Sequence, residues 1–385
     1  MKSNKRIYLD SASTTYVSGE ALQAMMPYFT SEFGNPASLH LYGRDAEKAL
    51  AKAREQVAKS INADPSEIYF TSGATESNNW MIRGALKNAT VKRVLVSSIE
   101  HPSIIELTKQ LAEDGYKIEY IKVDSEGVIL VSDLIAKLAK PAALVSVMTA
   151  NNEVGTIQFL HTIAKICEER GVMFHTDASQ AIGSVYIDVK EMKVDALSMS
   201  SHKIYGPKGI GALYLKKGLK LDKLVYGGGQ ERGMRSGTQN VPAIIGFGVA
   251  VELALRDATV NNTRIKQLRD YLIREIEGKI DNVKLNGHRV QRLPNNVNFS
   301  FKGIEGESLL MLLDMEGIAV STGSACSSGS LEKSYVLSAM GVADELAQGS
   351  LRMTLSRNTT KQDIDSFISV LVKTVKKLRQ MSALR

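Results

Sequence analysis

A lysine at the end of an apolar segment is the first candidate for chemistry in this sequence. Lys203 lies in Ser200–Gly211, which follows the apolar segment Val194–Met199 and precedes Ala212–Leu215. Two strands joined by a turn rich in glycine and proline fit this pattern, and they place the lysine where the first strand ends. An amine at the edge of a pocket loses solvation and becomes a nucleophile for carbonyl groups. Lys203 is therefore a candidate Schiff-base lysine, with an ordinary solvated lysine as the alternative.

A second candidate is Cys326, which lies in the small, polar and flexible stretch Ser321–Ser330. The other cysteine, Cys167, lies in the helical stretch Ile163–Arg170 and fits a buried, unreactive thiol. No apolar neighbour covers Cys326, and an exposed thiol that can swing is what sulfur transfer requires. From the loop alone, a reactive thiol and an inert thiol are equally well supported.

An acidic side chain is expected close to Lys203. Asp177 follows the predicted strand Val172–His175, with one helical turn and one strand between it and the lysine. The two side chains are therefore expected on neighbouring strands at one edge of a sheet. Asp177 either caps a helix or presents its carboxylate to a cationic ring nitrogen.

Two more polar positions fall at strand ends of the same kind. His101 follows the predicted strand Val94–Ser97 and stands just before a predicted helix. Asn151 and Asn152 follow the predicted strand Leu144–Met148. In an α/β fold this edge of the sheet carries the ligands. Asparagines there either orient a ligand or make a turn, and both interpretations stay open.

An anion site is expected where the predicted strand Ile68–Phe70 gives way to a helix. The connection Thr71–Asn79 contains a glycine, and free N–H groups at a helix start favour a phosphate, to which Thr75 adds a hydroxyl. The Gly-Lys-Ser/Thr ending of a P-loop is missing, and simple helix capping is the alternative. The glycine-rich loop Gly227–Thr238 also holds two arginines and a threonine suited to phosphate or carboxylate.

A sheet must bring these positions together. Strands and helices alternate from residue 68 to 215, which favours a mostly parallel sheet with covered faces. A long helical stretch, from about Pro242 to Gly278, is expected to bridge two domains. Asn295–Phe301 and Ile318–Ser321 are predicted strands of a second, smaller domain. Asp363–Leu378 is predicted to be an amphipathic helix whose apolar stripe belongs to a core.

The composition limits the classes of function. The chain has 385 residues, enough for two or three domains, and its 44% hydrophobic and 23% charged residues are typical of globular proteins. No stretch reaches the length of a membrane span, and the polar start Met1–Arg6 does not lead into a signal peptide, so a cytoplasmic protein without membrane association is expected. The net charge of +7 is modest and the basic residues are dispersed, which argues against nucleic-acid binding and fits an anionic substrate or an acidic protein partner.

Short segments of this chain, taken together and in order, resemble the NifS/IscS-type cysteine desulfurases, class V members of the fold-type I pyridoxal-phosphate enzymes. The similarity runs from about Ile7 to about Leu378. The segments that carry it are Gly34-Asn35-Pro36, Ser72-Gly73-Ala74-Thr75-Glu76, Glu100-His101, Asn151-Asn152-Glu153, His175-Thr176-Asp177, Ser201-His202-Lys203, Arg235-Ser236-Gly237-Thr238 and Gly323-Ser324-Ala325-Cys326. Each segment is weak evidence alone, but the ordered set is specific.

The resemblance implies an α/β fold of the fold-type I PLP-dependent transferases. Such a fold has a large domain, with a mostly parallel seven-stranded sheet covered by helices, and a smaller α+β domain. We expect residues 15–255 to form the large domain. Residues 1–14 together with 256–385 would form the small one, which carries the cysteine loop at about 321–333.

The resemblance also implies roles for the candidate residues. Lys203 would bind pyridoxal 5'-phosphate as a Schiff base, Asp177 would pair with the ring nitrogen, and Gln180 would bond the phenolic oxygen. His101 would stack on the ring and take part in proton transfer. The other cofactor-binding positions implied are Ala74, Thr75, Ser200, His202 and, from a partner subunit, Thr238.

The implied substrate is L-cysteine. Asn152 and Arg352 would orient it, with the arginine gripping its carboxylate. Cys326 would attack its sulfur, keep that sulfur as a persulfide and release alanine. The persulfide would pass to a sulfur-acceptor protein, such as an iron–sulfur scaffold, for iron–sulfur cluster assembly or for thio-cofactor or thio-RNA synthesis.

The resemblance also implies a homodimer, through Thr238, and no resident metal, and it allows a transient iron–sulfur cluster at Cys326. Family members that dock a scaffold through a C-terminal extension are longer than this chain, which ends at Arg385, so the acceptor is left open.

Three alternatives remain beside this assignment. Another pyridoxal-phosphate enzyme of the same fold, such as an aminotransferase or a selenocysteine lyase, is the nearest; Cys326 argues against an aminotransferase, which has no use for the thiol. The preference for cysteine or selenocysteine is left open by the sequence. A non-catalytic scaffold is disfavoured by the intact Lys203, Asp177 and His101. A basic nucleic-acid binder is disfavoured by the dispersed charge.

Overall fold

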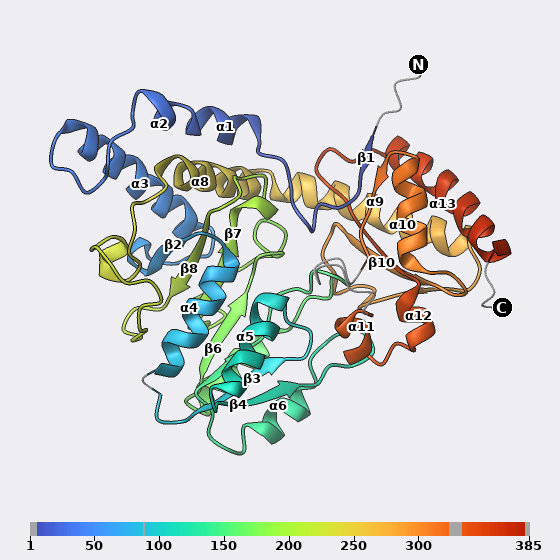
Figure 1. Ribbon diagram of the computed structural model, residues 1–385, viewed down its shortest axis with the longest axis horizontal. Coiled ribbons are helices and arrows are strands. Elements are labelled where there is room, and N and C mark those ends of the chain that lie inside the picture. The colour runs from blue at the N-terminus through green and yellow to red at the C-terminus, as the bar shows by residue number, and fades with distance from the viewer. Residues whose placement is uncertain (1–5, 88, 323–332, 382–385) are drawn as a thin grey trace.

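The computed structural model describes residues 6–87, 89–322 and 333–381. Within this part of the chain, the central element is a seven-stranded sheet (Figure 1). Its strands, in spatial order, are β2 (Ile68–Thr71), β8 (Gly211–Leu215), β7 (Ala196–Ser200), β6 (Met173–Asp177), β5 (Leu144–Ser146), β3 (Arg93–Ser97) and β4 (Lys117–Ile121). The strands from β7 to β4 are parallel, and β8 is antiparallel to both of its neighbours. The predicted mostly parallel sheet is therefore confirmed.

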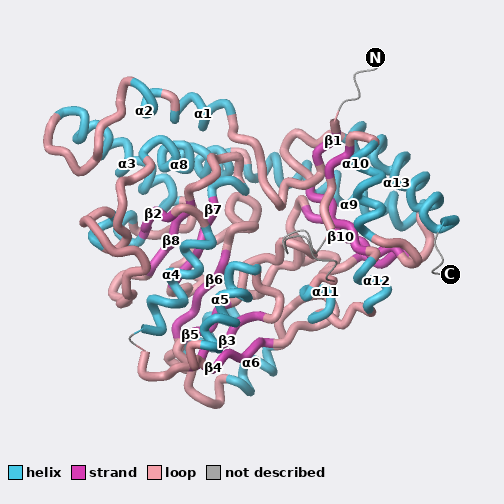
Figure 2. The backbone as a smooth tube through the Cα atoms, in the orientation of Figure 1, coloured by secondary structure: helices cyan, strands magenta, loops and turns pink. Residues whose placement is uncertain are grey.

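Helices cover both faces of this sheet because its strands are apolar on both sides. Alternate residues of β3 show this: Leu95 packs in one core, and Val94 and Val96 pack in the other. The first core includes side chains of α3 (Leu41–Lys59), α7 (Leu160–Glu169) and α8 (Val241–Arg256). The second includes side chains of α4 (Ala74–Lys87) and α5 (Pro102–Glu113). Figure 2 shows the strands enclosed between these helices.

A second, separate core lies beside the large sheet. It is built on an antiparallel sheet and on one parallel pair of short strands. The antiparallel sheet consists of β12 (Ser350–Thr354), β10 (Asn296–Phe301) and β9 (Val283–Leu285). The parallel pair consists of β1 (Ile7–Tyr8) and β11 (Ile318–Ala319). Helices α9 (Ala258–Lys279), α10 (Gly306–Met315) and α13 (Lys361–Met381) pack on them, and Leu9 from the start of the chain is fully buried among them. These separate cores support the proposed division into a large and a small domain, which stays a proposal.

The helix boundaries refine two sequence predictions. The amphipathic helix predicted at Asp363–Leu378 is α13, and its predicted stripe packs in the small core. The long helical stretch expected from about Pro242 to Gly278 is confirmed, and it consists of two helices, α8 and α9, which meet at Asp257. The remaining helices are α1 (Gly19–Met25), α2 (Pro27–Thr30), α6 (Val131–Lys137), α11 (Tyr335–Ala339) and α12 (Asp344–Gln348).

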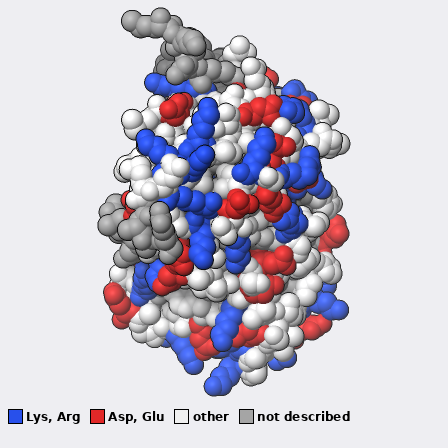
Figure 3. Space-filling view, turned by 90° about the vertical axis from the view of Figure 1, so that its right-hand side faces the viewer, with Lys and Arg blue, Asp and Glu red and all other residues white. Residues whose placement is uncertain are grey.

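Among the described residues, no helix combines the length and the apolar character that a membrane span needs. On the face of the small core, Lys and Arg side chains are interspersed with Asp and Glu (Figure 3).

Candidate active site

A cavity of about 600 Å³ opens at the carboxyl ends of β6 and β7, the edge of the sheet where ligands bind in α/β folds. It is lined from both sides, by the large sheet and by Arg352 of β12. Of the predicted site residues that the structure describes, all except Thr238 line this cavity. They are Ala74, Thr75, His101, Asn152, Asp177, Gln180, Ser200, His202, Lys203 and Arg352.

Lys203 ends a short 3-10 turn that follows β7 directly. Its Nζ atom donates to the carbonyl oxygens of Ala12 and Ser13, at 2.5 and 2.8 Å. Gln180 donates to the same Ala12 oxygen at 3.0 Å. The N-terminal segment therefore forms one wall of the cavity.

Asp177 is the last residue of β6, which pairs directly with β7, so the predicted placement on neighbouring strands is confirmed. Its carboxylate accepts hydrogen bonds from three donors. Asn78 Nδ2 binds one oxygen at 2.7 Å, and the N–H and hydroxyl of Ser179 bind the other at 2.9 and 2.5 Å. The carboxylate lines the cavity and also accepts hydrogen bonds from the turn that follows it. Its pairing with a ring nitrogen stays a prediction.

His101 is the N-cap residue of α5, and its Nδ1 atom accepts a hydrogen bond from the Ser103 N–H at 3.1 Å. The ring proton of the neutral imidazole is therefore on Nε2. Burial lowers the pKa of His101, and the nearby Lys203 lowers it further, while Asp177 acts in the opposite direction. The structure thus holds a neutral imidazole in one tautomer at the cavity wall.

The predicted anion site lies where β2 leads through Ser72 and Gly73 into α4. Ala74 and Thr75 form the first turn of that helix, whose N–H groups lack partners within the helix. Gly211 allows this turn to approach, because a Cβ atom there would lie 2.7 Å from the Gly73 Cα atom. These donors suit a phosphate group.

Two basic side chains border the anion site. His202 lies on the cavity wall, where burial, followed by Lys203, Lys208 and His101, lowers its pKa to about 4. It is therefore neutral at pH 7. Lys208 lines the same cavity and was not predicted as a site residue.

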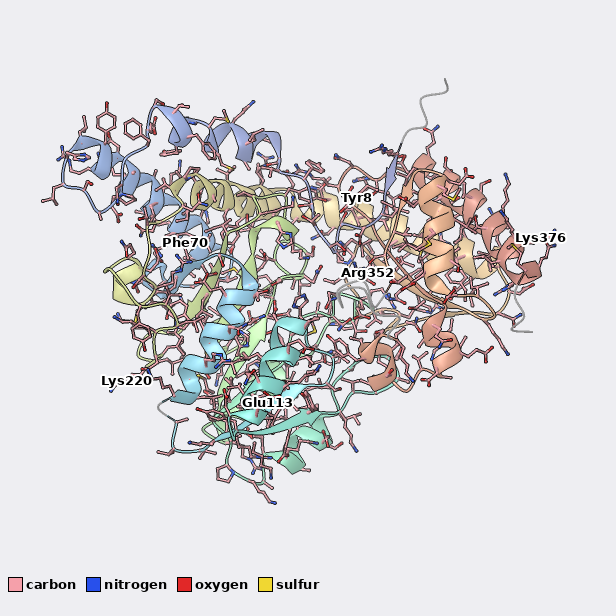
Figure 4. The ribbon with its side chains drawn as sticks, in the orientation of Figure 1. Tyr8, Phe70, Glu113, Lys220, Arg352 and Lys376 are labelled. Atoms are coloured by element: carbon pink, nitrogen blue, oxygen red, sulfur yellow. The ribbon has the colours of Figure 1, made fainter. Side chains whose placement is uncertain are left out.

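Arg352 lies between the large sheet and the small core, and its side chain is only 2% exposed (Figure 4). One Nη atom donates to the Asn152 carbonyl at 3.1 Å, and the other to Asp10 and Ser13 at 3.0 and 2.8 Å. Its Nε atom is buried and has no hydrogen-bond partner among the described residues. This N–H group is therefore a donor that the described residues leave unused.

Thr238 is exposed and is not among the residues that line the cavity. Its loop is tied to its own chain by a buried pair, Arg54 with Glu231 at 2.7 Å, and by Arg235 with Glu76 at 2.8 Å. The guanidinium of Arg232 stacks on Tyr69 and donates to the Ile68 carbonyl. Both arginines of this loop thus have partners within their own chain, and the carboxylate that Arg235 binds is that of Glu76. A role of this loop toward a phosphate stays a prediction.

Cys326 lies outside the described residues, but both flanks of the segment 323–332 are attached beside the cavity. On one side, Ser321 and Arg352 exchange backbone hydrogen bonds at 3.0 and 2.7 Å. On the other, the Ser334 hydroxyl binds the Glu153 carboxyl group at 2.5 Å. Cys167 is 1% exposed, and burial raises the pKa of its thiol to about 12, which confirms the predicted inert cysteine.

Glu153 is a buried carboxyl group next to Asn152, and burial raises its pKa to about 7 against the opposing effects of Ser334 and Arg352. In the unfolded chain the group ionises near pH 4.5. Between these two values the unfolded chain binds fewer protons than the folded one, so the free energy of unfolding falls as the pH rises.

We expect Glu153→Gln, which cannot ionise, to remove this pH dependence. Between pH 5 and pH 8, the free energy of unfolding should fall by on the order of 2–3 kcal/mol more in the wild type than in the variant. Denaturant midpoints of both proteins at the two pH values measure this loss. An equal change in the free energy of unfolding in the two proteins would contradict a protonated Glu153 in the folded state.

The residues around this cavity fit pyridoxal phosphate. They include an amine for its aldehyde, a carboxylate held by three donors for its ring nitrogen, and a helix start with a hydroxyl for its phosphate. Sequence reasoning missed the contributions of Asp10, Ser13, Asn78 and Ser103. Their roles depend on contacts with distant segments, and only the polar character of the stretches that contain them was visible.

Comparisons with known proteins agree with this geometry. A family model described as aminotransferase class-V matches residues 7–367. A protein from Clostridium botulinum strain Hall, named cysteine desulfurase IscS, is 49% identical over 386 residues, which cover 99% of this chain and 97% of that protein. A solved structure of a NifS-like protein has a TM-score of 0.91 and 37% identity, covering 97% of this chain and 100% of that one. The structure titled SspA in complex with cysteine has a TM-score of 0.81 and 32% identity, covering 92% of this chain and 100% of that one.

Proposed function

This chain belongs to the aminotransferase class-V family and is a pyridoxal-phosphate-dependent cysteine desulfurase, for which we propose the following roles of its residues. One observation carries the proposal. The fold gathers the Lys203 amine, the Asp177 carboxylate, the His101 imidazole and the free Nε–H of Arg352 around one cavity. These four groups suffice to bind the cofactor and an amino acid and to move a proton.

Bound pyridoxal phosphate supplies an aldehyde for a Schiff base and an electron sink for removal of a proton at the α-carbon. Lys203 would hold the aldehyde carbon of the cofactor, and Asp177 would hold its ring nitrogen. Ala74, Thr75, Ser200 and His202 hold the phosphate, and Gln180 turns toward the phenolic oxygen.

The remaining residues act on the substrate, L-cysteine. Arg352 binds its carboxylate through the free Nε–H, and Asn152 orients it. The amine of Lys203 would remove the α-proton, and His101 would move a proton through Nε2.

Cys326 carries out the sulfur transfer. Its thiolate attacks the substrate sulfur, so that an S–S bond forms while the C–S bond breaks. The electron pair of the broken bond stays with the carbon fragment, which takes up a proton and leaves as alanine. The support for this role is the composition of its loop and the attachment of both loop flanks beside the cavity.

The products of L-cysteine test this function. We expect alanine and one sulfur atom bound to the protein in equal amounts, the sulfur being detected by alkylation and mass spectrometry and released as sulfide by a thiol. Pyruvate with ammonia would indicate another lyase. A keto acid with conversion of the cofactor to its amine form would indicate an aminotransferase.

Arg352→Lys should bind L-cysteine more weakly, because lysine keeps the charge beside Asp10 but lacks the planar guanidinium donors. Because the charge-assisted hydrogen bonds between the guanidinium and the substrate carboxylate are lost, we expect KM to be about 10²-fold higher. Steady-state alanine release measures KM, and cofactor binding, which the arginine does not contact, should be unchanged. A KM equal to that of wild type would remove Arg352 from the substrate site.

We propose a homodimer in which Thr238 reaches the cofactor site of the partner, because its exposed side chain does not line the cavity of its own chain. Exposed apolar side chains around α2 and the start of α3 support such a contact, since soluble monomers rarely expose contiguous apolar patches. They are Phe29, Phe33, Leu39 and Leu41.

The sulfur acceptor is proposed to be an iron–sulfur scaffold or another acidic acceptor protein. The cytoplasmic location and a transient iron–sulfur cluster at Cys326 stay predictions.

A further inference from the structure

A buried amide beside the cavity has no role in the reaction as proposed so far. Asn78 lies in α4 and is fully buried. Its Nδ2 atom donates to Asp177 Oδ2 at 2.7 Å and to Ser103 Oγ at 2.8 Å. Both hydrogens of the amide nitrogen are thereby used, one toward each of two neighbouring elements.

The second of these bonds leads to His101. Because Ser103 Oγ accepts a hydrogen from Asn78, its own hydrogen is available for His101 Nδ1, which lies 3.0 Å away. The Ser103 N–H donates to the same nitrogen. The hydrogen bonds therefore run in one direction, from Asn78 through Ser103 to His101, and they keep the ring proton on Nε2.

The orientation of the Asn78 amide is fixed by its neighbour. A rotated amide would place its oxygen against the Asp177 carboxylate, which repels it. In the observed orientation Oδ1 is buried and accepts no hydrogen bond from the described residues. Such an atom costs about 1–3 kcal/mol, so this asparagine is poorly explained by stability alone.

We propose that Asn78 is a positioning residue that holds the Asp177 carboxylate and, through Ser103, the Nε2–H tautomer of His101. A single amide thus sets both the partner of the cofactor ring nitrogen and the imidazole that moves a proton. The inference rests on the proposed roles of Asp177 and His101.

The test uses the full chain labelled with ¹⁵N-histidine, in which there are six histidines to resolve. The His101 signal is identified as the one lost in His101→Gln. In wild type, two-bond N–H correlations should show only the Nε2–H form. In Asn78→Ala, the amide no longer directs the Ser103 hydroxyl toward Nδ1. The Ser103 N–H still donates to Nδ1 and keeps the Nε2–H form in excess, but with one donor fewer a minor Nδ1–H form is expected beside it. With the cofactor bound, kcat for alanine should fall about 10–100-fold while KM changes little.

Three further variants separate positioning from a loss of structure. Ser103→Ala cuts only the branch to His101 and should also give mixed tautomers, whereas Ser103→Thr keeps the hydroxyl and should behave as wild type. Asn79→Ala removes the neighbouring amide, which donates to the Thr75 and Ser103 carbonyls, and should leave the tautomer unchanged.

A pure Nε2–H form in both Asn78→Ala and Ser103→Ala, with the kcat of wild type, would overturn the proposal. The tautomer is read in the cofactor-free chain. A failure of the desulfurase assignment would therefore change the products of the reaction but not this readout.

Discussion

A Cys326→Ala variant should stay yellow with bound pyridoxal phosphate, yet release alanine from L-cysteine at least about 10³ times more slowly than wild type. The residues proposed to hold the cofactor come from other segments, namely β6, β7 and the start of α4. Removing the thiol therefore leaves cofactor binding intact and removes only the atom that accepts the sulfur. Absorbance of the purified protein and alanine release measure the two effects separately.

The matched control is Cys167→Ala. Cys167 packs in the core beneath the large sheet, and its raised pKa keeps it protonated at pH 8, so its loss should not slow alanine release. A small loss of stability is expected from the cavity that the substitution leaves. If Cys326→Ala were as active as wild type, the sulfur acceptor would be another group and the proposed mechanism would be wrong.

Lys203→Ala should be the most damaging single change, lowering the rate of alanine release by about 10⁴-fold or more, because one amine serves both as the Schiff-base partner and as the base. The amine is held 2.5 and 2.8 Å from two carbonyl oxygens, a geometry that alanine cannot replace. Lys203→Arg keeps a positive charge beside those carbonyls and should be equally inactive. Stopped-flow alanine formation and the visible absorbance of the purified variants measure the loss.

A chemical test locates the same amine. Borohydride reduction of the wild-type enzyme should attach the cofactor irreversibly to a peptide that contains Lys203. Lys208 lines the same cavity and is the best internal control. Label on Lys208 in place of Lys203, or an active Lys203→Arg variant, would contradict the assignment.

The part of the site that could be predicted from the sequence is the part that local patterns determine. Asp177 and Lys203 follow two consecutive strands of one sheet, and parallel connections place the ends of such strands at one edge, so their proximity was predictable. The strand, the glycine turn and the helix start around Thr75 were predicted in the same way, and the anion site there stays a prediction. The resemblance to a known family added Arg352, which carries no local signal.

The rest depends on contacts between distant segments. Nothing in the sequence near Arg232 and Arg235 indicates that the first stacks on Tyr69 and the second pairs with Glu76, so these partners within the chain could not be predicted. Asn78 likewise resembles any polar residue of an amphipathic helix until β6 is placed beside it. Cys326, Thr238 and the domain division stay predictions.

The wall that the N-terminal segment contributes has a consequence for biosynthesis. Ala12 and Ser13 hold the Lys203 amine, but Ala12 is itself held by Thr354, which is 342 residues further along the chain. Leu9 is buried in a core made largely of residues after Ile265. A chain still attached to the ribosome can thus complete the large sheet and yet lack this wall until Thr354 has been translated and has left the exit tunnel. Catalysis by a chain still being synthesised is therefore not expected before Thr354 has emerged.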